Sequence, residues 1–208
     1  ARRAYNHNTA DKHNEVSQGV SVALFFMNMN LREVQTMSEI TIRTATPDDA
    51  GMLLGIYKYY IENTAITYEL EVPTVDDFRG RIEKTLKKYP YIAAECDGKI
   101  IGYAYAGVFK DRAAYDHSVE TSIYVALNEK RRGTGTLLYN ELEKRLAAIG
   151  IKNAYACIAC PENDDEYLNH DSIMFHEKLG YELVGTFRKC AKKFGRYYDM
   201  VWMEKMIG

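Results

Sequence analysis

From Ile40 onward, apolar residues recur along the chain with two alternating spacings, and this alternation constrains the fold more than any other feature of the sequence. Segments with a spacing of two are typical of β-strands, whereas a spacing of about 3.6 is typical of amphipathic helices. A chain that switches repeatedly between them is expected to form a layered α/β domain. Residues 1–36, rich in Asn, His and Gln, lack the alternation. We expect residues 1–36 to be a leader or extension and residues 37–208 to form one domain.

Two N-terminal cap sequences mark the first expected helices. Thr46-Pro47-Asp48-Asp49 supplies an N-cap residue, a proline at the first helical position and an acidic first turn. Thr74-Val75-Asp76-Asp77 repeats the device. The residues expected on the buried faces of these two helices are Met52, Ile56 and Tyr59/Tyr60, and then Phe78, Ile82, Leu86 and Tyr89. Two later helices are expected, one with Leu138, Leu142, Leu146 and Ile149 on one side and Gly150 as its stop, and a short one over 173–179.

Strands are expected between these helices. Asp97-Gly98 is a strong hairpin signal between two apolar segments. In the strand 119–125, Glu120, Ser122 and Tyr124 share one face, because successive side chains alternate. The expected strands cover residues 40–43, 91–96, 99–106, 119–125, 154–158, 181–186 and 198–204.

The overall charge and the cysteine content exclude several classes of protein. The 208 residues include 27 Lys and Arg against 29 Asp and Glu, so the formal net charge is -2. This balance gives no general attraction to nucleic acids or acidic membranes. The apolar run 20–27 is far shorter than the ~20 residues of a transmembrane helix. Four cysteines in a chain this long do not indicate a disulfide scaffold. We expect neither nucleic acid nor a membrane as partner.

A basic, glycine-containing turn after the strand 119–125 is the most informative motif. It contains Lys130, Arg131, Arg132, Gly133, Thr134, Gly135 and Thr136, and a long amphipathic helix follows. Free backbone N–H groups and the positive end of that helix suit a phosphate or pyrophosphate. The turn lacks the Gly-Lys-Ser/Thr ending of a Walker loop and the full Gly-x-Gly-x-x-Gly of a dinucleotide site. A plain glycine turn with solvated basic residues is the alternative.

This turn resembles the acyl-CoA pyrophosphate loop of the GNAT acetyltransferase superfamily, Gln/Arg-x-x-Gly-x-Gly/Ala, with Lys130 at the first position. Several ordered blocks resemble the phosphinothricin and methionine sulfone/sulfoximine acetyltransferase group within it. They are Tyr60-Ile61-Glu62, Tyr89-Pro90, 102–107, 112–116, Glu120, 176–181 and Lys193-Phe194-Gly195. The resemblance spans Ile40 to about Met203. It implies the GNAT fold, an α/β architecture with a mixed, mostly antiparallel twisted sheet flanked by helices.

The resemblance also implies an activity. We expect an N-acetyltransferase that moves an acetyl group from acetyl-CoA to the primary amine of a small amino-acid-like substrate, without a metal, as a cytoplasmic homodimer. Acetylation of a protein N-terminus or a polyamine, and a noncatalytic CoA-binding sensor on the same fold, remain alternatives.

Site residues follow from the same resemblance, and each has a structural alternative. Glu120 is the expected general base, and His176 the expected group that protonates or solvates the departing thiolate. The residues expected to bind acetyl-CoA are Ile123, Tyr124 and Val125, the turn residues 130–136, and Asn169 with Ser172. Backbone N–H groups near Tyr124 and Val125 are expected to stabilise the carbonyl oxygen. The residues expected to bind the substrate are Tyr68, Glu69, Arg112 and Tyr115.

Two features leave alternatives open. The acidic segment 162–168 is longer than its counterpart in the resembled enzymes, so Asn163 rivals Asn169, and the segment either shapes the substrate entrance or is a solvated loop. Cys157 and Cys160 end an apolar strand, where neither a redox dithiol nor a zinc site is expected. We interpret them as buried structural cysteines, with double displacement through one of them as the less favoured route.

Overall fold

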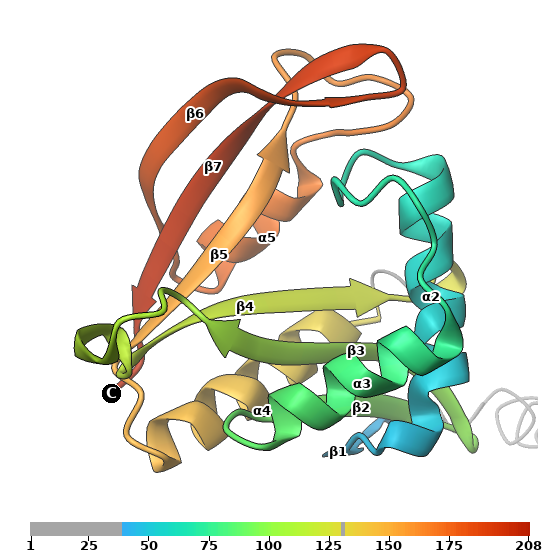
Figure 1. The fold of residues 1–208 in the computed structure, drawn as a ribbon, viewed down its shortest axis with the longest axis vertical. Helices are drawn as coiled ribbons and strands as arrows, with labels where there is room; N and C mark the ends of the chain where they lie inside the picture. The colour runs from blue at the N-terminus through green and yellow to red at the C-terminus, as the bar shows by residue number, and fades with distance from the viewer. Residues whose placement is uncertain (1–38, 130–131) are drawn as a thin grey trace, which may run out of the picture. The chain divides into compact units, whose positions relative to one another are not determined.

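A seven-stranded sheet in the order β1-β2-β3-β4-β5-β7-β6 is the centre of a computed structural model that describes residues 39–129 and 132–208 (Figure 1). β4 and β5 run parallel, and all other neighbours are antiparallel. The strands are β1 (Thr41–Thr44), β2 (Tyr91–Cys96), β3 (Lys99–Val108), β4 (Ser118–Val125), β5 (Asn153–Cys160), β6 (Glu182–Lys193) and β7 (Arg196–Met206). The expected mixed, mostly antiparallel sheet is confirmed. The proposed boundary near residue 37 lies outside the described residues and stays a prediction.

Helices cover both faces of the first four strands (Figure 1). The α-helices are α2 (Ala50–Asn63), α3 (Val75–Leu86), α4 (Thr134–Ala148) and α5 (Asp171–Lys178), and three short 3-10 helices are η1 (Pro47–Asp49), η2 (Ala113–Tyr115) and η3 (Leu127–Glu129). α2 and α3 pack with Tyr91 and Tyr103 on one face of the sheet. α4 packs with Ile92 and Val119 on the other face. Alternate residues of one strand therefore serve two separate cores.

The caps expected from the sequence are present. The Thr74 side chain accepts a hydrogen bond from the Asp77 amide at 3.1 Å and begins α3. The Thr46 amide donates to Asp49 Oδ2 at 2.7 Å, although this cap begins η1 rather than α2 itself. The local sequence thus marks where η1 and α3 begin.

The buried face expected for α2 is correct at Tyr60, which is buried, and at Ile56, which packs on the core, but wrong at Met52 and Tyr59. Met52 is 52% exposed and Tyr59 is 38% exposed, whereas Leu53, Tyr57 and Ile61 are buried. α2 has apolar residues on more than one side, and helical spacing alone does not indicate which side packs on the sheet. The side expected for α4 is likewise wrong at its end, because the helix stops at Ala148 and leaves Ile149 54% exposed.

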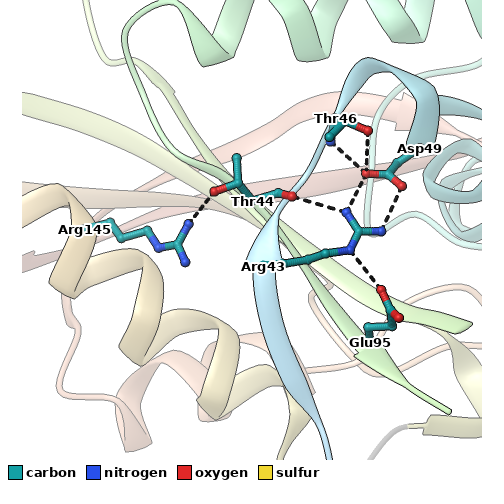
Figure 2. A network of polar contacts seen from close by, with 6 residues as sticks. All are labelled: Arg43, Thr44, Thr46, Asp49, Glu95 and Arg145. Atoms are coloured by element: carbon teal, nitrogen blue, oxygen red, sulfur yellow. Dashed lines mark hydrogen bonds and ion pairs between the residues drawn. The ribbon is translucent and has the colours of Figure 1, made fainter. Parts of the chain in front are cut away.

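A buried ion-pair cluster joins β1 to its surroundings (Figure 2). Arg43 donates to both carboxylate oxygens of Asp49 at 2.8 and 2.9 Å, and its Nε donates to Glu95 at 2.9 Å. The same Asp49 carboxylate caps η1 through Thr46. The Arg43 hydrogen bond holds the pKa of Asp49 below its ordinary 3.8. One guanidinium therefore connects β1, the cap and β2.

Candidate active site

β4 and β5 begin side by side and then separate (Figure 1). They pair only over Ser118–Thr121 and Asn153–Ala156. Beyond these residues β4 stays bonded to β3, and β5 stays bonded to β7. The edge of β4 that faces β5 after Thr121 therefore has no strand beside it in the described sheet. Such an edge offers backbone groups to an extended ligand.

The space between the separating strands is a cleft. Its lining residues are Ile66, Thr121, Ser122, Ile123, Tyr124, Tyr139, Ala156, Cys157, Ile158, Ala159, Ser172 and His176. They come from β4, β5, α4, α5 and the loop after α2. The cleft therefore brings together residues from four helices and strands and a loop that are far apart in the sequence.

Of the three β4 residues expected at the acyl donor, Ile123 and Tyr124 line this cleft, whereas Val125 does not, and its carbonyl accepts a hydrogen bond from the Tyr60 hydroxyl at 2.5 Å. The Tyr124 ring packs against the rings of Tyr57 and Tyr60, with ring centroids 4.7 and 5.3 Å apart. Ile123 and Val125 pack on the α4 side of the sheet. Because these side chains pack inside the protein, a ligand at this edge would bind to main-chain groups.

Glu120 lies on β4 and is half-buried. It pairs with Tyr155 of β5, one residue before the pairing of the two strands ends. Its cross-strand neighbour on β3 is Gly107, where an added Cβ meets nothing within 4 Å. The carboxyl therefore has open space on that side. Burial raises the pKa of Glu120 above its ordinary 4.5, and the positive charge of Lys110 opposes the shift. A carboxylate with a raised pKa is a better proton acceptor near neutral pH.

Lys110 is a residue that the sequence analysis missed. Its Nζ lies 4.9 Å from the centre of the Phe109 ring and 5.6 Å from that of Trp202. Its charge lowers the pKa of Glu120, in part offsetting burial. The two predicted substrate residues in this block, Arg112 and Tyr115, are exposed at η2 and do not line the cleft. Lys110 follows the end of β3, where no periodicity indicates the direction of a side chain.

His176 is buried and makes two hydrogen bonds. Its Nδ1 lies 2.7 Å from the Ser172 carbonyl oxygen, which only accepts, so Nδ1 carries the proton. Nε2 then accepts from the Tyr139 hydroxyl at 2.7 Å. Burial lowers the pKa of His176, so the ring is neutral near pH 7. The pair lines the cleft. Tyr139 was not predicted, and its signal was one hydroxyl on the otherwise apolar face of α4.

The turn before α4 has the backbone of an anion site. Gly133 adopts a φ of 82°, a left-handed conformation that favours glycine, and it precedes the first helical residue. A Cβ on Gly135 would approach the Phe175 ring to 3.0 Å, so a larger residue here requires the ring to shift. Arg132 pairs with Glu129. Lys130 and Arg131 lie outside the described residues.

This turn fits the pyrophosphate of an acyl-CoA. The first amides of α4 have no carbonyl partners within the helix and point along its axis. Thr134 is 1% exposed, and its hydroxyl oxygen has no hydrogen-bond partner among the described residues. Thr136 is exposed on the first turn. The buried Thr134 hydroxyl and the free amides that follow the left-handed Gly133 form a set of donors suited to a phosphate group.

The residues near α5 divide into two groups. Ser172 lines the cleft, and its carbonyl orients His176. Asn169 is exposed, and its side chain accepts from the Asp171 amide at 3.0 Å and donates to the Asp171 carboxylate at 3.1 Å. Neither Asn169 nor its rival Asn163 lines the cleft. The assignment of Asn169 to the pantetheine arm stays a prediction.

Tyr68 and Glu69 belong to the loop after α2. The Tyr68 hydroxyl donates to the Asp199 carbonyl at 2.6 Å, which ties this loop to β7. One carboxylate oxygen of Glu69 pairs with Arg81 at 2.7 Å. The other is buried without a partner among the described residues. That oxygen can accept a hydrogen bond from an amine at low cost, because its desolvation has already occurred.

The cysteines of β5 are free thiols. Burial raises the pKa of Cys157 to about 12, and burial also raises the pKa of Cys160. A thiol with such a pKa is a poor nucleophile, because little thiolate exists near pH 7. Within residues 39–129 and 132–208, no group of three or more His, Cys, Asp or Glu side chains is placed to hold a metal ion.

Comparisons with known proteins agree with this geometry. Residues 42–202 match the family described as acetyltransferase (GNAT) domain. The chain is 34% identical to a phosphinothricin N-acetyltransferase of Streptomyces viridochromogenes, over 80% of this chain and 87% of that protein. It is 30% identical to an L-methionine sulfoximine/L-methionine sulfone acetyltransferase of Pseudomonas paraeruginosa, over 79% and 92% of the two chains.

A solved structure shares the fold. The crystal structure of a GNAT superfamily phosphinothricin acetyltransferase from Sinorhizobium meliloti in complex with AcCoA superposes with a TM-score of 0.74. The two chains are 33% identical, and the match covers 81% of this chain and 89% of the other. In the part of the chain that the structure describes, no helix has both the length and the apolar character needed to span a membrane.

Proposed function

Because the chain belongs to the acetyltransferase (GNAT) domain family, we propose that it transfers the acetyl group of acetyl-CoA to the primary amine of a small amino-acid-like substrate. The observation that carries this proposal is the half-buried Glu120, whose pKa is raised and which directly precedes Thr121, the first β4 residue that lines the cleft, although Glu120 itself is not a lining residue. The phosphinothricin and methionine sulfoximine activities named for relatives at 34% and 30% identity support this class of acceptor.

Two parts of the chain would hold acetyl-CoA, which supplies an activated thioester carbonyl. The cleft-facing edge of β4 at residues 123–125 offers backbone groups to the pantetheine arm. The first turn of α4, with Arg132 and the neighbouring Lys130 and Arg131, binds the pyrophosphate. The family match supports this arrangement.

Glu120 accepts a proton from the substrate ammonium, directly or through water, and so frees the nitrogen lone pair. The nitrogen then bonds to the thioester carbon, and the C–S bond breaks. A backbone N–H on the β4 edge at Tyr124 or Val125 donates to the developing oxyanion. As the bond breaks, the Tyr139 hydroxyl turns from His176 Nε2 to donate its proton to the departing sulfur, so that CoA leaves as the thiol. The second proton of the attacking nitrogen then returns to the Tyr139 oxygen and restores the hydrogen bond to His176. In this assignment His176 acts through Tyr139.

Direct attack is favoured over double displacement. The pKa of Cys157, raised to about 12, leaves little thiolate to accept an acyl group. Replacing Cys157 and Cys160 together with alanine should therefore leave acetyl transfer intact. Loss of transfer in a variant that still folds would favour an acyl-cysteine route.

A substrate screen tests the proposal. Thiol release from acetyl-CoA is measured with methionine sulfone, methionine sulfoximine, phosphinothricin, polyamines and short peptides as acceptors. We expect turnover with at least one of the three amino-acid analogues and its loss in Glu120→Gln. Turnover only with peptides or polyamines would overturn the small-molecule assignment. Acetyl-CoA binding without turnover on any acceptor would indicate a noncatalytic sensor.

We also propose that the protein is a homodimer. β6 is an edge strand, and its apolar residues Leu183, Val184 and Phe187 are 62%, 55% and 53% exposed. An exposed apolar edge strand of this length favours association with a second copy. Light scattering after size-exclusion chromatography should give a dimer, and Phe187→Asp should shift it to a monomer. A monomeric wild-type protein would contradict the assignment.

The cytoplasm is the proposed location. Cys157, Cys160 and Cys190 are free thiols, and thiols are kept reduced in the cytosol. Acetyl-CoA, the proposed donor, would have to be available in the same compartment. Fractionation of the native cells with antibody detection tests this, and recovery in an extracellular or periplasmic fraction would contradict it.

A further inference from the structure

The acidic segment 162–168 is an ordered part of the fold, organised by Asp165. Asp165 Oδ1 accepts hydrogen bonds from the amides of Tyr167 and Leu168 at 2.8 and 2.9 Å. The Asp165 amide donates to the Leu168 carbonyl at 2.9 Å. The second carboxylate oxygen accepts from the Tyr198 hydroxyl at 3.0 Å. One half-buried carboxylate thus closes the segment and attaches it to β7. The sequence left two interpretations of this segment, a solvated loop and a part of the substrate entrance. These contacts do not fit a solvated loop.

Arg196, the first residue of β7, fastens the same segment. Its guanidinium contacts Asp165 at 3.0 Å and both oxygens of Glu166 at 2.7 and 2.8 Å. It also lies 5.3 Å from the centre of the Tyr167 ring. That ring stacks on Phe194 at 4.3 Å. The segment is therefore bound to the turn between β6 and β7 by charge and by aromatic stacking.

The segment in turn holds the loop that carries the proposed substrate residues. The Ala65 amide donates to the Tyr167 carbonyl at 3.0 Å. Ala65, which is 0% exposed, packs in one apolar cluster with Leu168 and Tyr198. The buried Lys193 adds a hydrogen bond from its Nζ to the Thr67 carbonyl at 2.8 Å. Residues 65–68 are thus fixed from the side of β5, β6 and β7.

This loop bears three features of the proposed amine site. Ile66 lines the cleft. Tyr68 reaches β7 through the Asp199 carbonyl. Glu69 holds a buried carboxylate oxygen that has no partner within the described residues. A shift of the loop by about 1 Å would move this acceptor relative to Glu120, and displacements of that size are enough to weaken substrate positioning.

We propose that Asp165 is a positioning residue, which sets the loop 64–69 for the amine substrate through the Tyr167 carbonyl and the Ala65 amide. The inference rests on the proposed function. Asp165 makes no contact with the cleft, so it acts on the substrate only through the loop. Because the contacts of Asp165 are with the loop and the segment and not with the turn before α4, the role is separate from acetyl-CoA binding.

Hydrogen exchange and kinetics on the full chain test the proposal together. Asp165→Ala removes all the contacts of the carboxylate, and Asp165→Asn keeps one oxygen that can accept from the Tyr167 and Leu168 amides. Glu162→Ala is the matched control, because it removes the same charge from an exposed position of the same segment. For each variant, exchange at the Ala65 amide is measured, as are kcat and the KM values for the amine and for acetyl-CoA.

We expect Asp165→Ala to speed exchange at Ala65 and to raise the amine KM by about tenfold, the effect of losing hydrogen bonds to a charged group. The KM for acetyl-CoA should stay within about twofold. Asp165→Asn should restore part of both effects, and Glu162→Ala should behave as wild type. Unchanged exchange, or faster exchange with an unchanged amine KM, would overturn the proposal.

The same design separates this inference from the proposed function. If wild type acetylates none of the amine probes, the proposed function fails, and the positioning role fails with it, whatever the exchange data show. If wild type is active and Asp165→Ala raises the KM values for amine and acetyl-CoA equally, only the positioning role is overturned, because general loosening then explains the result.

Discussion

The two halves of the sheet are built differently. Strands β1 to β4 carry helices on both faces (Figure 1). The first four of the six residues of β2 are buried. β6, at the opposite edge, is exposed along almost its whole length. Both halves share an apolar core, to which β5 and β7 contribute buried residues such as Ala154 and Met203. The outer part of the second half is held in addition by polar contacts such as those of Arg196 and Lys193. We infer that substitutions in the first half act on stability and those in the outer part of the second half on substrate selection or assembly.

Glu120 should be the largest exception to this division, because it lies in the first half and acts on chemistry. Replacement by Gln is expected to lower kcat/KM by about 10²–10⁴-fold, the usual contribution of a general base. The wild-type rate should rise with pH through the pKa of Glu120, which lies above 4.5, since only the carboxylate accepts a proton. Steady-state kinetics across pH measures both effects.

The control for Glu120→Gln is its thermal unfolding. The variant should melt close to wild type, because burial favours the neutral form that Gln imitates. An unchanged rate, or a rate lost only together with the fold, would contradict the role of Glu120 as base.

The buried core of the first half and the exposed end of the second half should differ in stability. Leu142, on α4, is 0% exposed, and its replacement by Ala is expected to lower the free energy of unfolding by about 2–5 kcal/mol. Met206, at the end of β7, is 67% exposed, and Met206→Ala should change it by less than about 0.5 kcal/mol. Urea unfolding monitored by circular dichroism gives both values. Equal losses would contradict the difference in burial between these two positions.

How far the sequence predicted the fold depends on whether the signal was local. α3 was predictable because Thr74 caps it, and the β2–β3 hairpin because Asp97-Gly98 turns it. β6 was expected to end at residue 186 but continues to Lys193, because pairing with β7, and not apolar alternation, sustains it. The expected buried stripe of α2 was wrong at Met52 and Tyr59 for the same reason, since the choice of buried side chains depends on the partner surface.

The site follows the same rule. Glu120 could be placed because strand parity alone puts it on one face with Ser122 and Tyr124. Tyr139 could not, since its role depends on His176, 37 residues away. Asp165 depends in the same way on Arg196, and no spacing in the sequence reports that contact.

Each half contains one arginine ion-pair cluster: Arg43 with Asp49 and Glu95 in the first half, and Arg196 with Asp165 and Glu166 in the second. Asp49→Asn weakens the buried cluster of the first half and should lower the free energy of unfolding by about 1–3 kcal/mol at neutral pH. Since the folded pKa of Asp49 lies below its ordinary 3.8, its stabilisation is present above pH 3.8 and is lost as the pH falls through the folded pKa. The difference from wild type should therefore shrink in acid. Unfolding titrations at several pH values measure it.

Glu166→Gln is the matched change in the second half, where Glu166 pairs with Arg196 at an exposed position. It should alter stability less than Asp49→Asn, because solvent screens the pair. A larger loss for Glu166→Gln would reverse the inferred roles of the two clusters.

Lys110 gives the smallest expected effect and connects the halves, because it follows β3 and its Nζ lies 5.6 Å from the ring of Trp202 on β7. Its charge lowers the pKa of Glu120 against the effect of burial. In the pH profile of kcat, Lys110→Ala should therefore move the rise on the acid side to higher pH, and Arg112→Ala should leave that rise in place. Equal shifts in both variants would mean that the field at Glu120 comes from the whole basic block, and the pH profile of kcat for each variant decides between these outcomes.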